Sequence, residues 1–377
     1  MTKTELKTEE EIRCIGCGAL LQTTDKTKAG YTPKTALEKG LETGEVYCQR
    51  CFRLRHYNEI QDVHLTDDDF LKLLNEIGSK DALIVNVVDV FDFNGSLIPG
   101  LHRFVGKNPV LLVGNKVDLL PKSQKRGRLT QWLRERAHEA GLRPTDVVLT
   151  SAMKADEVEH LKEMIEQYRN GKDVYVVGVT NVGKSSLINQ IINTSAGVKD
   201  LITTSQFPGT TLDQIEIPLE DGNSLIDTPG IIHRHQMAHV LGAKDLKLIA
   251  PKKEIKPKVY QLNEGQTLFF GGVARFDFIK GDRSSFTCYV SNDLNIHRTK
   301  LEKADELYQK QKGELLQPPR NEEKDTFPEL VRFEFLIKEK TDIVFAGLGW
   351  VTVPEPGVVV AGWAPKGIDV LIRKSII

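Results

Sequence analysis

No apolar run in the sequence approaches the roughly 20 residues that a membrane-spanning helix needs, so we expect no membrane-embedded segment. The first residues, Met1 to Glu11, are charged and lack an apolar core, which argues against a secretory signal. The sequence also lacks an excess of either charge, because its 51 Lys and Arg residues nearly balance its 52 Asp and Glu residues, which gives a net charge of -1. Overall charge therefore predicts no nucleic-acid partner, and any basic patch must be local. A cytoplasmic location is expected.

Cysteine is scarce: of five residues, four form two C-x-x-C pairs and Cys288 stands alone. Without an export signal, disulfides are the less favoured use of these thiols. Hydrophobic residues make up 40% and charged residues 27% of the 377 positions, which is typical of a globular protein with about two or three domains.

Three segments differ in pattern. Residues 1–65 hold the cysteine pairs, and two ligand pairs can fold such a piece around a metal without a large core. Residues 66–240 alternate continuous apolar runs, such as Ala82–Asp89, with amphipathic stretches, which predicts a mostly parallel α/β sheet covered on both faces. Residues 251–377 begin with a proline-bounded linker and continue with short alternating runs and Gly or Pro turns. They predict a smaller β-rich domain with one helix near Leu301.

The segment Gly178–Ser185 matches the phosphate-loop pattern G-x-x-x-x-G-K-S, with a predicted strand before it and a predicted helix after it. Its backbone N–H groups are expected to bind phosphate oxygens. Lys184 would contact the β- and γ-phosphates as a catalytic residue, and Ser185 would ligate Mg²⁺. The predicted nucleotide contacts in this loop are Asn181, Val182, Gly183, Lys184, Ser185 and Ser186.

Further elements complete a nucleotide site. In D-T-P-G, Asp227 is expected to hold Mg²⁺ through water, and the N–H of Gly230 is expected to bind the γ-phosphate. Asp118 can accept hydrogen bonds from the N1–H and amino group of guanine, a donor pair that adenine lacks, which favours GTP over ATP. The predicted base-binding residues are Asn115, Lys116, Asp118, Ser151 and Ala152. Thr211 is the favoured γ-phosphate-sensing Mg²⁺ ligand and catalytic switch residue, with Thr210 as the alternative.

These motifs come in an unusual order, because N-K-x-D and S-A precede the phosphate loop instead of following it. The order resembles the circularly permuted GTPases, and the cysteine pairs ahead of it resemble the bacterial YqeH family. That resemblance implies an α/β fold with a circularly permuted P-loop GTPase domain and an N-terminal zinc module, and the alternating runs after residue 251 add the β-rich C-terminal domain. It also implies a ribosome-biogenesis GTPase that acts on the small (30S) subunit and its rRNA. We expect a monomer that binds GTP and GDP.

Rejoining the chain near Asn170–Asp173 requires only a short connector, because the ends of such a domain lie close together. The D-T-P-G switch then leads through residues 231–250 into the C-terminal domain. We therefore expect nucleotide state to change the pose of residues 251–377.

Two features of the sequence refine the expected chemistry. The position after D-T-P-G, where Ras-like GTPases carry a water-orienting glutamine, is Ile231, and Ile232 follows. Neither side chain can hydrogen-bond water, so slow intrinsic turnover is expected. Asn181 matches the asparagine that helps hold K⁺ in potassium-activated GTPases, and a cation there would neutralise developing charge. The alternative is an asparagine tolerated in a turn.

The two C-x-x-C pairs predict a closed, structural Zn²⁺ site with Cys14, Cys17, Cys48 and Cys51 as ligands. The long interval between the pairs is expected to be a loop because it contains Gly30, Pro33, Gly40 and Gly44. A redox dithiol is the alternative, but it lacks a surrounding βαβ pattern. Basic residues around the second pair suit phosphate backbones, or are solvated surface charge; they are Arg50, Arg53, Arg55 and His56.

For several other residues the sequence allows both a purely structural and a functional interpretation. Two basic clusters, Lys122/Lys125/Arg126/Arg128 and Lys252/Lys253/Lys256/Lys258, either contact rRNA or are solubilising surface. His233, His235 and His239 are interpreted as exposed polar residues in preference to metal ligands, and Cys288 as a buried small hydrophobe. Asp89 and Asp92 are expected to cap a helix or support the nucleotide rim.

Three functions remain in competition. The favoured one is a GTP-hydrolysing switch that binds an RNA–protein assembly. The others are a passive RNA-binding assembly factor with a degenerate nucleotide site, and a GTP-dependent metal chaperone that carries metal on its cysteines. Intact Lys184, Ser185 and Asp227 argue against the passive factor. Zinc that a chelator removes only with unfolding would exclude the chaperone.

Overall fold

The computed structural model describes residues 12–15, 19–26, 28–44, 46–57, 64–65, 67–194, 203–206, 213–231 and 235–376. Contacts divide the chain into two compact units. The first unit contains Met1–Val88, Ile98–Asn115 and Arg134–Ile232, and the second contains Asp89–Leu97, Lys116–Leu133 and His233–Ile377. Within the described ranges, none of the helices combines the length and apolarity that crossing a bilayer demands.

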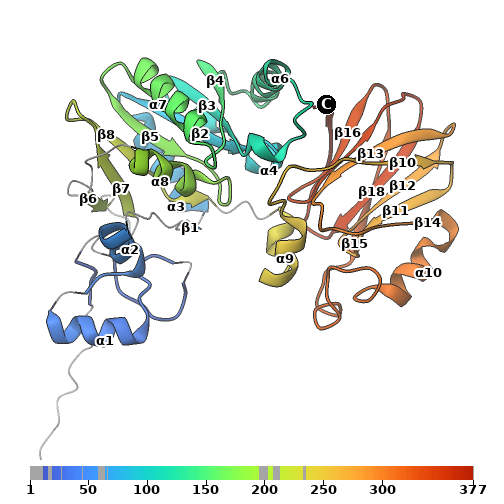
Figure 1. The fold of residues 1–377 in the computed structure, drawn as a ribbon, viewed down its shortest axis with the longest axis horizontal. Helices are drawn as coiled ribbons and strands as arrows, with labels where there is room; N and C mark the ends of the chain where they lie inside the picture. Colours follow the sequence, from blue (N-terminus) through green and yellow to red (C-terminus); the bar gives the residue numbers. More distant parts are fainter. Residues whose placement is uncertain are drawn as a thin grey trace, which may run out of the picture. The chain divides into compact units, whose positions relative to one another are not determined.

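The N-terminal part of the first unit contains two helices, α1 (Lys34–Thr43) and α2 (Gln49–Tyr57), shown in blue in Figure 1. The prediction of a loop between the cysteine pairs is wrong, because α1 occupies ten of those residues. Pro33 precedes the helix with φ -59, and Gly44 ends it in the left-handed conformation with φ 74. The proline and glycine that suggested a loop are thus the start and stop signals of a helix.

A seven-stranded sheet forms the centre of the first unit, with strand order β4-β3-β2-β5-β8-β7-β6. Its strands are β2 (Ala82–Asp89), β3 (Val110–Asn115), β4 (Asp146–Leu149), β5 (Asp173–Val177), β6 (Thr203–Gln206), β7 (Asp213–Pro218) and β8 (Ser224–Asp227). Every residue of β2 and β3 is buried, as the continuous apolar runs predicted. β6 and β7 pair antiparallel, whereas β2, β5 and β8 run parallel.

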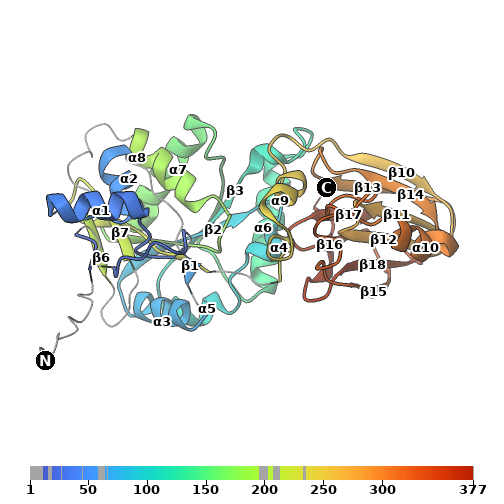
Figure 2. The same cartoon turned by 90° about the horizontal axis from the view of Figure 1, so that it is seen from below.

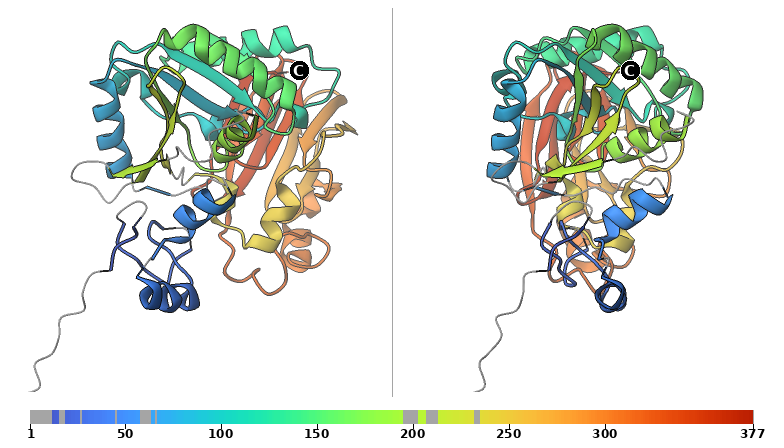
Figure 3. Two further views of the ribbon diagram at one scale, coloured as in Figure 1. Left: turned by 60° about the vertical axis from the view of Figure 1, so that its left-hand side comes forward. Right: turned by 90° about the vertical axis from the view of Figure 1, so that its left-hand side faces the viewer.

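Helices cover both faces of this sheet. Figure 2 shows α7 (Ala155–Arg169) and α8 (Lys184–Thr194) on one face, and α3 (Asp67–Gly78) with the short α5 (Leu101–Phe104) on the other. The same separation of α3 from α7 is visible in the two views of Figure 3. A two-residue parallel pair, β1 (His64–Leu65) with β9 (Gly230–Ile231), was not predicted.

The strand order of this sheet agrees with the permuted order of the sequence motifs. β5, the strand before the phosphate loop, lies between β2 and β8. The strands that precede β5 in sequence lie on one side of it, and the strands that follow lie on the other. The expected short connector is present, because α7 ends at Arg169 and β5 begins at Asp173. Asn170 and Gly171 make the turn with φ values of 49 and 68.

The second unit contains two five-stranded antiparallel sheets, β10-β13-β17-β16-β19 and β14-β11-β12-β18-β15. Their strands are β10 (Lys258–Leu262), β11 (Gln266–Phe270), β12 (Ala274–Lys280), β13 (Ser284–Val290), β14 (Ile296–Lys300), β15 (Leu330–Leu336), β16 (Thr341–Phe345), β17 (Gly349–Val353), β18 (Val359–Pro365) and β19 (Val370–Lys374). Phe286 of one sheet packs on Phe276 and Phe278 of the other at ring-centroid distances of 5.2 and 4.9 Å, so the sheets form a sandwich. The predicted β-rich domain is confirmed, and α10 (Leu301–Gln311) is the helix expected near Leu301.

Segments from earlier in the chain belong to this second unit. They include the short helix α4 (Phe93–Ser96), the 3-10 turn η1 (Val117–Leu119) and the start of α6 (Arg126–Glu139). The indole of Trp132 donates a hydrogen bond of 3.0 Å to the carbonyl of Lys374 in β19. A 3-10 turn η3 (Met237–His239) and a helix α9 (Ala243–Ile249) precede the first strand, and Met237 and Ile249 lie in the sandwich core.

Candidate nucleotide site and cysteine cluster

The phosphate loop connects β5 to α8 and has a backbone that few residue types adopt. Gly183 has φ 85, and Asn181 has φ 65, one of the few non-glycine residues with positive φ among the described residues. Asparagine tolerates this region better than most side chains do. Gly178 passes so close to β2 that a Cβ on it would lie 2.9 Å from the carbonyl oxygen of Val87. Both glycines of the motif are therefore required by the backbone.

Lys184 begins α8 and is 2% exposed. Its ammonium donates to the carboxylate of Asp227 and to the carbonyl of Thr228, so the phosphate loop and D-T-P-G meet at this side chain. Thr228 is fixed to β5 by its hydroxyl, which donates to the carbonyl of Val176 at 2.7 Å. Gly230 lies against Thr180 of the phosphate loop, where a Cβ would meet Cγ2 at 3.3 Å. Ser185, at 6% exposed, lies beside Lys184.

Asn115 joins three of the predicted elements. It ends β3 and is 1% exposed. Its side-chain amide donates to the carbonyl of Val182 in the phosphate loop at 2.8 Å, and its Oδ1 accepts from the N–H of Ala152 at 3.3 Å. Ser151, fully buried, accepts from the N–H of Met153 at 3.2 Å. Asn115 thus acts as a structural clamp: its side chain connects the end of β3 to the phosphate loop and to Ala152. The N-K-x-D motif alone does not reveal this role.

Lys116 and Asp118 follow in the second unit. Lys116 has φ 64, and its ammonium forms an ion pair of 2.7 Å with Asp89 at the end of β2. Asp118 lies in η1, half-buried. Asp89 thus contacts a residue of the predicted base-binding element, whereas Asp92, which precedes α4, makes no side-chain cap.

Asp92 is a buried carboxyl whose role the sequence did not indicate. It accepts hydrogen bonds from the amide of Gln236 at 3.0 Å and from the N–H of Gly347 at 3.1 Å. Burial, with a smaller contribution from the charge of Asp89, raises the pKa of Asp92 to about 6. Gln236 lies shortly after D-T-P-G and also donates to the carbonyl of Gly95. The two aspartates at the end of a strand, Asp89 and Asp92, were a signal in the sequence that this position matters. The partners of Asp92 could not be predicted, because they come from distant parts of the chain.

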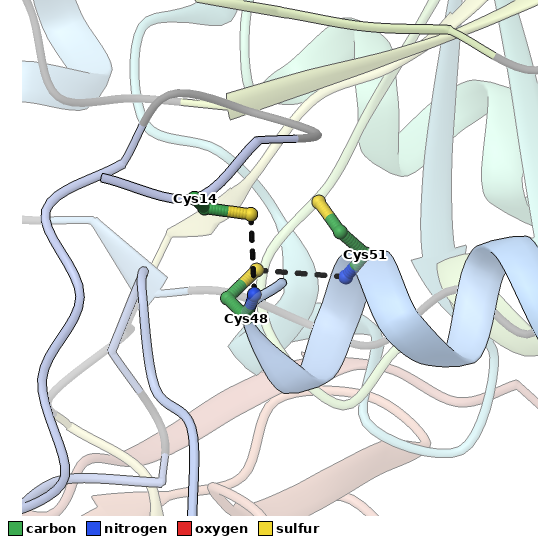
Figure 4. A group of neighbouring side chains, drawn as sticks. All are labelled: Cys14, Cys48 and Cys51. Atoms are coloured by element: carbon green, nitrogen blue, oxygen red, sulfur yellow. Dashed lines mark hydrogen bonds between the residues drawn. The ribbon is translucent and has the colours of Figure 1, made fainter. Parts of the chain in front are cut away.

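Three cysteines converge at the start of α2 (Figure 4). The Sγ atoms of Cys14, Cys48 and Cys51 all lie within 4.8 Å of one another, and all three residues are buried. The N–H of Cys48 donates to the Sγ of Cys14 at 3.1 Å, and the N–H of Cys51 donates to the Sγ of Cys48 at 3.5 Å. Such N–H donors stabilise thiolates, the form that binds metal. The three thiols therefore form a group that could hold a metal ion.

Several predicted residues lie outside the described residues: Cys17, Thr210, Thr211, Ile232 and His233. His235 and His239 are exposed, and Cys288 is a buried free thiol in the sandwich core, as expected. Burial raises the pKa of the Cys288 thiol, which makes it unreactive. Arg50 is 6% exposed, so the structure removes it from the predicted basic surface around the second cysteine pair.

Similarity to known proteins agrees with this geometry. A family described as "50S ribosome-binding GTPase" matches residues 173–264, and one described as "YqeH-like, C-terminal" matches residues 283–376. The chain is 61% identical to YqeH of Bacillus subtilis over 98% of this chain and 100% of that protein. It is 32% identical to NO-associated protein 1, chloroplastic/mitochondrial, of Arabidopsis thaliana over 94% of this chain and 72% of that protein.

Among solved structures, the GDP-bound structure of YlqF is 25% identical and covers 48% of this chain and 64% of that chain. Its TM-score of 0.29 is too low to bear on the fold.

The phosphate loop beside D-T-P-G, with the base-element strands ahead of both in sequence, defines a P-loop GTPase with circularly permuted motifs. The chain belongs to the YqeH family. It is accordingly a GTP hydrolase that binds GTP and GDP.

Proposed function

We propose that this protein is a GTP-driven switch that assists assembly of the small ribosomal subunit through nucleotide-dependent binding to rRNA or pre-ribosomal particles. The observation that best supports GTP binding and hydrolysis is the buried ion pair between Lys184 and Asp227. It places the lysine proposed to bind phosphate next to the aspartate proposed to hold Mg²⁺. The ribosomal partner rests on the resemblance to the YqeH family. The matching family description names the 50S subunit, so both subunits belong in the test.

The nucleotide roles follow from chemistry. The backbone of Asn181–Gly183, with Lys184 and Ser186, would bind phosphates, and Asp118 would select guanine. The hydroxyl of Ser185 and the carboxylate of Asp227 are hard oxygen donors, which suit Mg²⁺. Thr211 would complete the magnesium site and Gly230 would sense the γ-phosphate. Ser151 and Ala152 would line the base beside Asn115.

The cysteine cluster fits structural zinc. Sulfurs within 4.8 Å of one another are close to the spacing of about 3.8 Å that Zn–S bonds of about 2.3 Å give around one tetrahedral ion. With Cys17 as the fourth ligand, the site would have no open position for catalysis. Zinc would then stabilise residues 1–65 as a module, beside a G domain at 66–240 and a recognition domain at 251–377.

A basic surface in the second unit supports binding to a polyanion. The two basic clusters are more than a hundred residues apart in sequence, yet they meet: the N–H of Ile255 donates to the carbonyl of Leu119 at 2.9 Å. The N–H of Lys122 also donates to the carboxylate of Glu254 at 2.8 Å. Seven of the eight cations are exposed, namely Lys122, Lys125, Arg126, Arg128, Lys252, Lys253 and Lys256. Exposed cations on two segments that meet in this way suit an RNA backbone.

Turnover is proposed to be slow without an activator and to be stimulated by K⁺. Isoleucine follows D-T-P-G, so no side chain at that position orients water. Asn181 has a left-handed backbone that asparagine tolerates, so the K⁺ role rests on its match to the asparagine of potassium-activated GTPases.

Sedimentation of the protein with separated 30S and 50S subunits tests the proposal, in a GTP analogue, in GDP and without nucleotide. Binding to 30S that depends on nucleotide state supports the switch. Equal binding in all three conditions would instead indicate a passive factor, and binding only to 50S would overturn the choice of subunit. Lys184→Ala is the matched variant, expected to lose the nucleotide dependence. A Lys184→Ala protein with full cellular function would also favour the passive factor.

A further inference from the structure

Asp89 is placed to fix the side chain of Lys116. Its Oδ2 accepts from the Lys116 ammonium at 2.7 Å, and the two side chains are 11% and 31% exposed. Partial burial makes a charge-assisted hydrogen bond of this length stronger than an ordinary surface ion pair. The two residues lie at the ends of different strands, β2 and β3, so their contact depends on the fold and not on a local turn.

The carboxylate of Asp89 is itself held rigidly. Its Oδ1 accepts from the N–H groups of Phe91 and Asp92 at 2.9 and 3.4 Å, and its own N–H donates to the hydroxyl of Ser96 at 3.0 Å. One carboxylate oxygen therefore fixes the turn, and the other remains for Lys116. Lys116 in turn has φ 64, a conformation that costs a lysine steric energy. A strained backbone and a locked partner together leave the lysine little freedom.

We propose that Asp89 is a positioning residue for nucleotide binding: it holds Lys116 so that the stem of this lysine is ready to pack against the guanine base. Fixing the stem beforehand removes the entropy cost of ordering a long side chain when the base binds. This inference rests on the proposed guanine-binding role of the N-K-x-D element, of which Lys116 is a part.

The turn that carries Asp89 is also anchored to the C-terminal part of the second unit. Asp92, which shares the turn, accepts from the amide of Gln236 and from the N–H of Gly347. The side chain of Gln236 contacts Asp92 and Gly95, and neither it nor Gly347 is part of the predicted nucleotide site. The pose of Asp89, and with it the affinity for guanine nucleotides, should therefore respond to this anchor.

Asp89→Asn is the test variant, because the amide keeps an acceptor oxygen for the turn and loses the charge that attracts Lys116. Calorimetric titration with GDP should show Kd raised about tenfold, the change expected when one charge-assisted hydrogen bond is lost. In GTP hydrolysis, KM should rise by a similar factor with kcat nearly unchanged, since the contact serves binding equally in the ground and transition states. Asp81→Asn is the matched control, as it breaks the exposed Asp81–Lys172 pair of 2.6 Å.

A double-mutant cycle separates positioning from a general effect on the turn. In a Lys116→Met protein, Asp89→Asn should change the Kd for GDP by less than about twofold, because the partner is already gone. An equal loss with and without Lys116, or no loss in either protein, would overturn the proposal. Gln236→Leu gives a second route: it should raise the Kd while leaving all predicted nucleotide contacts in place.

Asp118→Asn tests the underlying assignment independently. Exchanging a carboxylate acceptor for an amide should weaken GDP and favour xanthosine diphosphate, whose base presents an oxygen in place of the amino group. If Asp118→Asn leaves base preference unchanged, the guanine assignment itself fails. If it shifts the preference while Asp89→Asn has no effect, only the positioning role fails.

Discussion

The side-chain amide of Asn115 donates a hydrogen bond of 2.8 Å to the backbone carbonyl of Val182, although the two residues are 67 positions apart. Its Oδ1 accepts from the N–H of Ala152. One buried side chain thus fixes the phosphate loop and the S-A element to the end of β3. In this GTPase the chain order of those elements is permuted, yet the clamp that holds them together is intact.

Asn115→Ala should therefore weaken GDP binding, because it releases the phosphate loop in addition to removing one predicted base contact. The buried carbonyl of Val182 loses its donor, which costs about 1–3 kcal/mol, or roughly fivefold to 150-fold in Kd. Calorimetric titration with GDP measures the change. Asn223→Ala is a suitable control, because the amide of Asn223 donates to the carbonyl of Gly171 at an exposed site. Wild-type affinity in Asn115→Ala would contradict the clamp.

Zinc content provides a second prediction. Purified protein should contain one zinc ion per chain, and Cys51→Ser should lower this content and destabilise residues 1–65, since metal binding is coupled to folding in such modules. Metal analysis and limited proteolysis give the two readouts. Cys288→Ala, which removes a buried thiol of the sandwich core, should retain full zinc. Full zinc in Cys51→Ser would exclude this cysteine as a ligand.

The sequence predicted the α/β sheet of the first unit well, and the reason is physical. Strands buried on both faces, such as β2, require continuous apolar runs, and a phosphate loop requires glycine at fixed places. In the sandwich the alternating runs Thr267–Phe270, Ser285–Val290, Val331–Ile337 and Gly357–Trp363 indicated β11, β13, β15 and β18, but the sequence did not indicate the other six strands. β14 and β19 are short edge strands with few buried residues, so alternation is weak in them.

Contacts between side chains that are distant in the sequence could not be predicted in this way. The pairing of Asp89 with Lys116 and of Asp92 with Gln236 depends on which strand ends meet in three dimensions. The helix α1 was missed for a different reason, because Pro33 and Gly44 mark a helix boundary as readily as a loop. Only the residues between them distinguish the two, and Lys34–Thr43 holds just three apolar side chains, of Ala36, Leu37 and Leu41.

Charge reversal on the basic surface should weaken RNA binding. Lys125→Glu combined with Lys253→Glu alters one residue from each cluster, and each phosphate interaction that is removed should also reduce the slope of log affinity against log salt by about one. Fluorescence anisotropy with labelled rRNA fragments at several salt concentrations measures both quantities. Lys338→Glu with Lys366→Glu is the control, since these exposed lysines belong to the same unit but not to the surface. Equal weakening in both variants would indicate a non-specific charge effect.

Asp92 makes stability depend on pH in an unusual direction. Its pKa is raised from 3.8 to about 6 in the folded protein, so the folded state binds the extra proton. Stability from this group is complete below pH 3.8 and is lost as pH rises through 6, by roughly 3 kcal/mol in total. The groups that act on it are Asp89, which raises the pKa, and Arg373 and Lys116, which lower it.

Asp92→Asn should therefore flatten the pH dependence of urea unfolding between pH 4 and about 6.5. It should also lower stability overall, because an asparagine amide facing the Gln236 amide places two donors together. Asp156→Asn, on the exposed surface of α7, is the control and should leave the slope unchanged. A slope in Asp92→Asn equal to that of the wild-type protein would contradict the buried, protonated carboxyl.

The role of K⁺ can be separated from the backbone requirement at Asn181. Because φ at this position is 65, Asn181→Gly preserves the loop conformation and removes only the side chain. We expect wild-type GTP turnover to be about tenfold faster in K⁺ than in Na⁺ at equal ionic strength, since a cation beside the phosphates offsets developing charge. Asn181→Gly should turn over at the same slow rate in both salts while binding GDP normally. Equal wild-type rates in the two salts would exclude potassium activation, and a K⁺ preference that survives Asn181→Gly would assign the cation to other ligands.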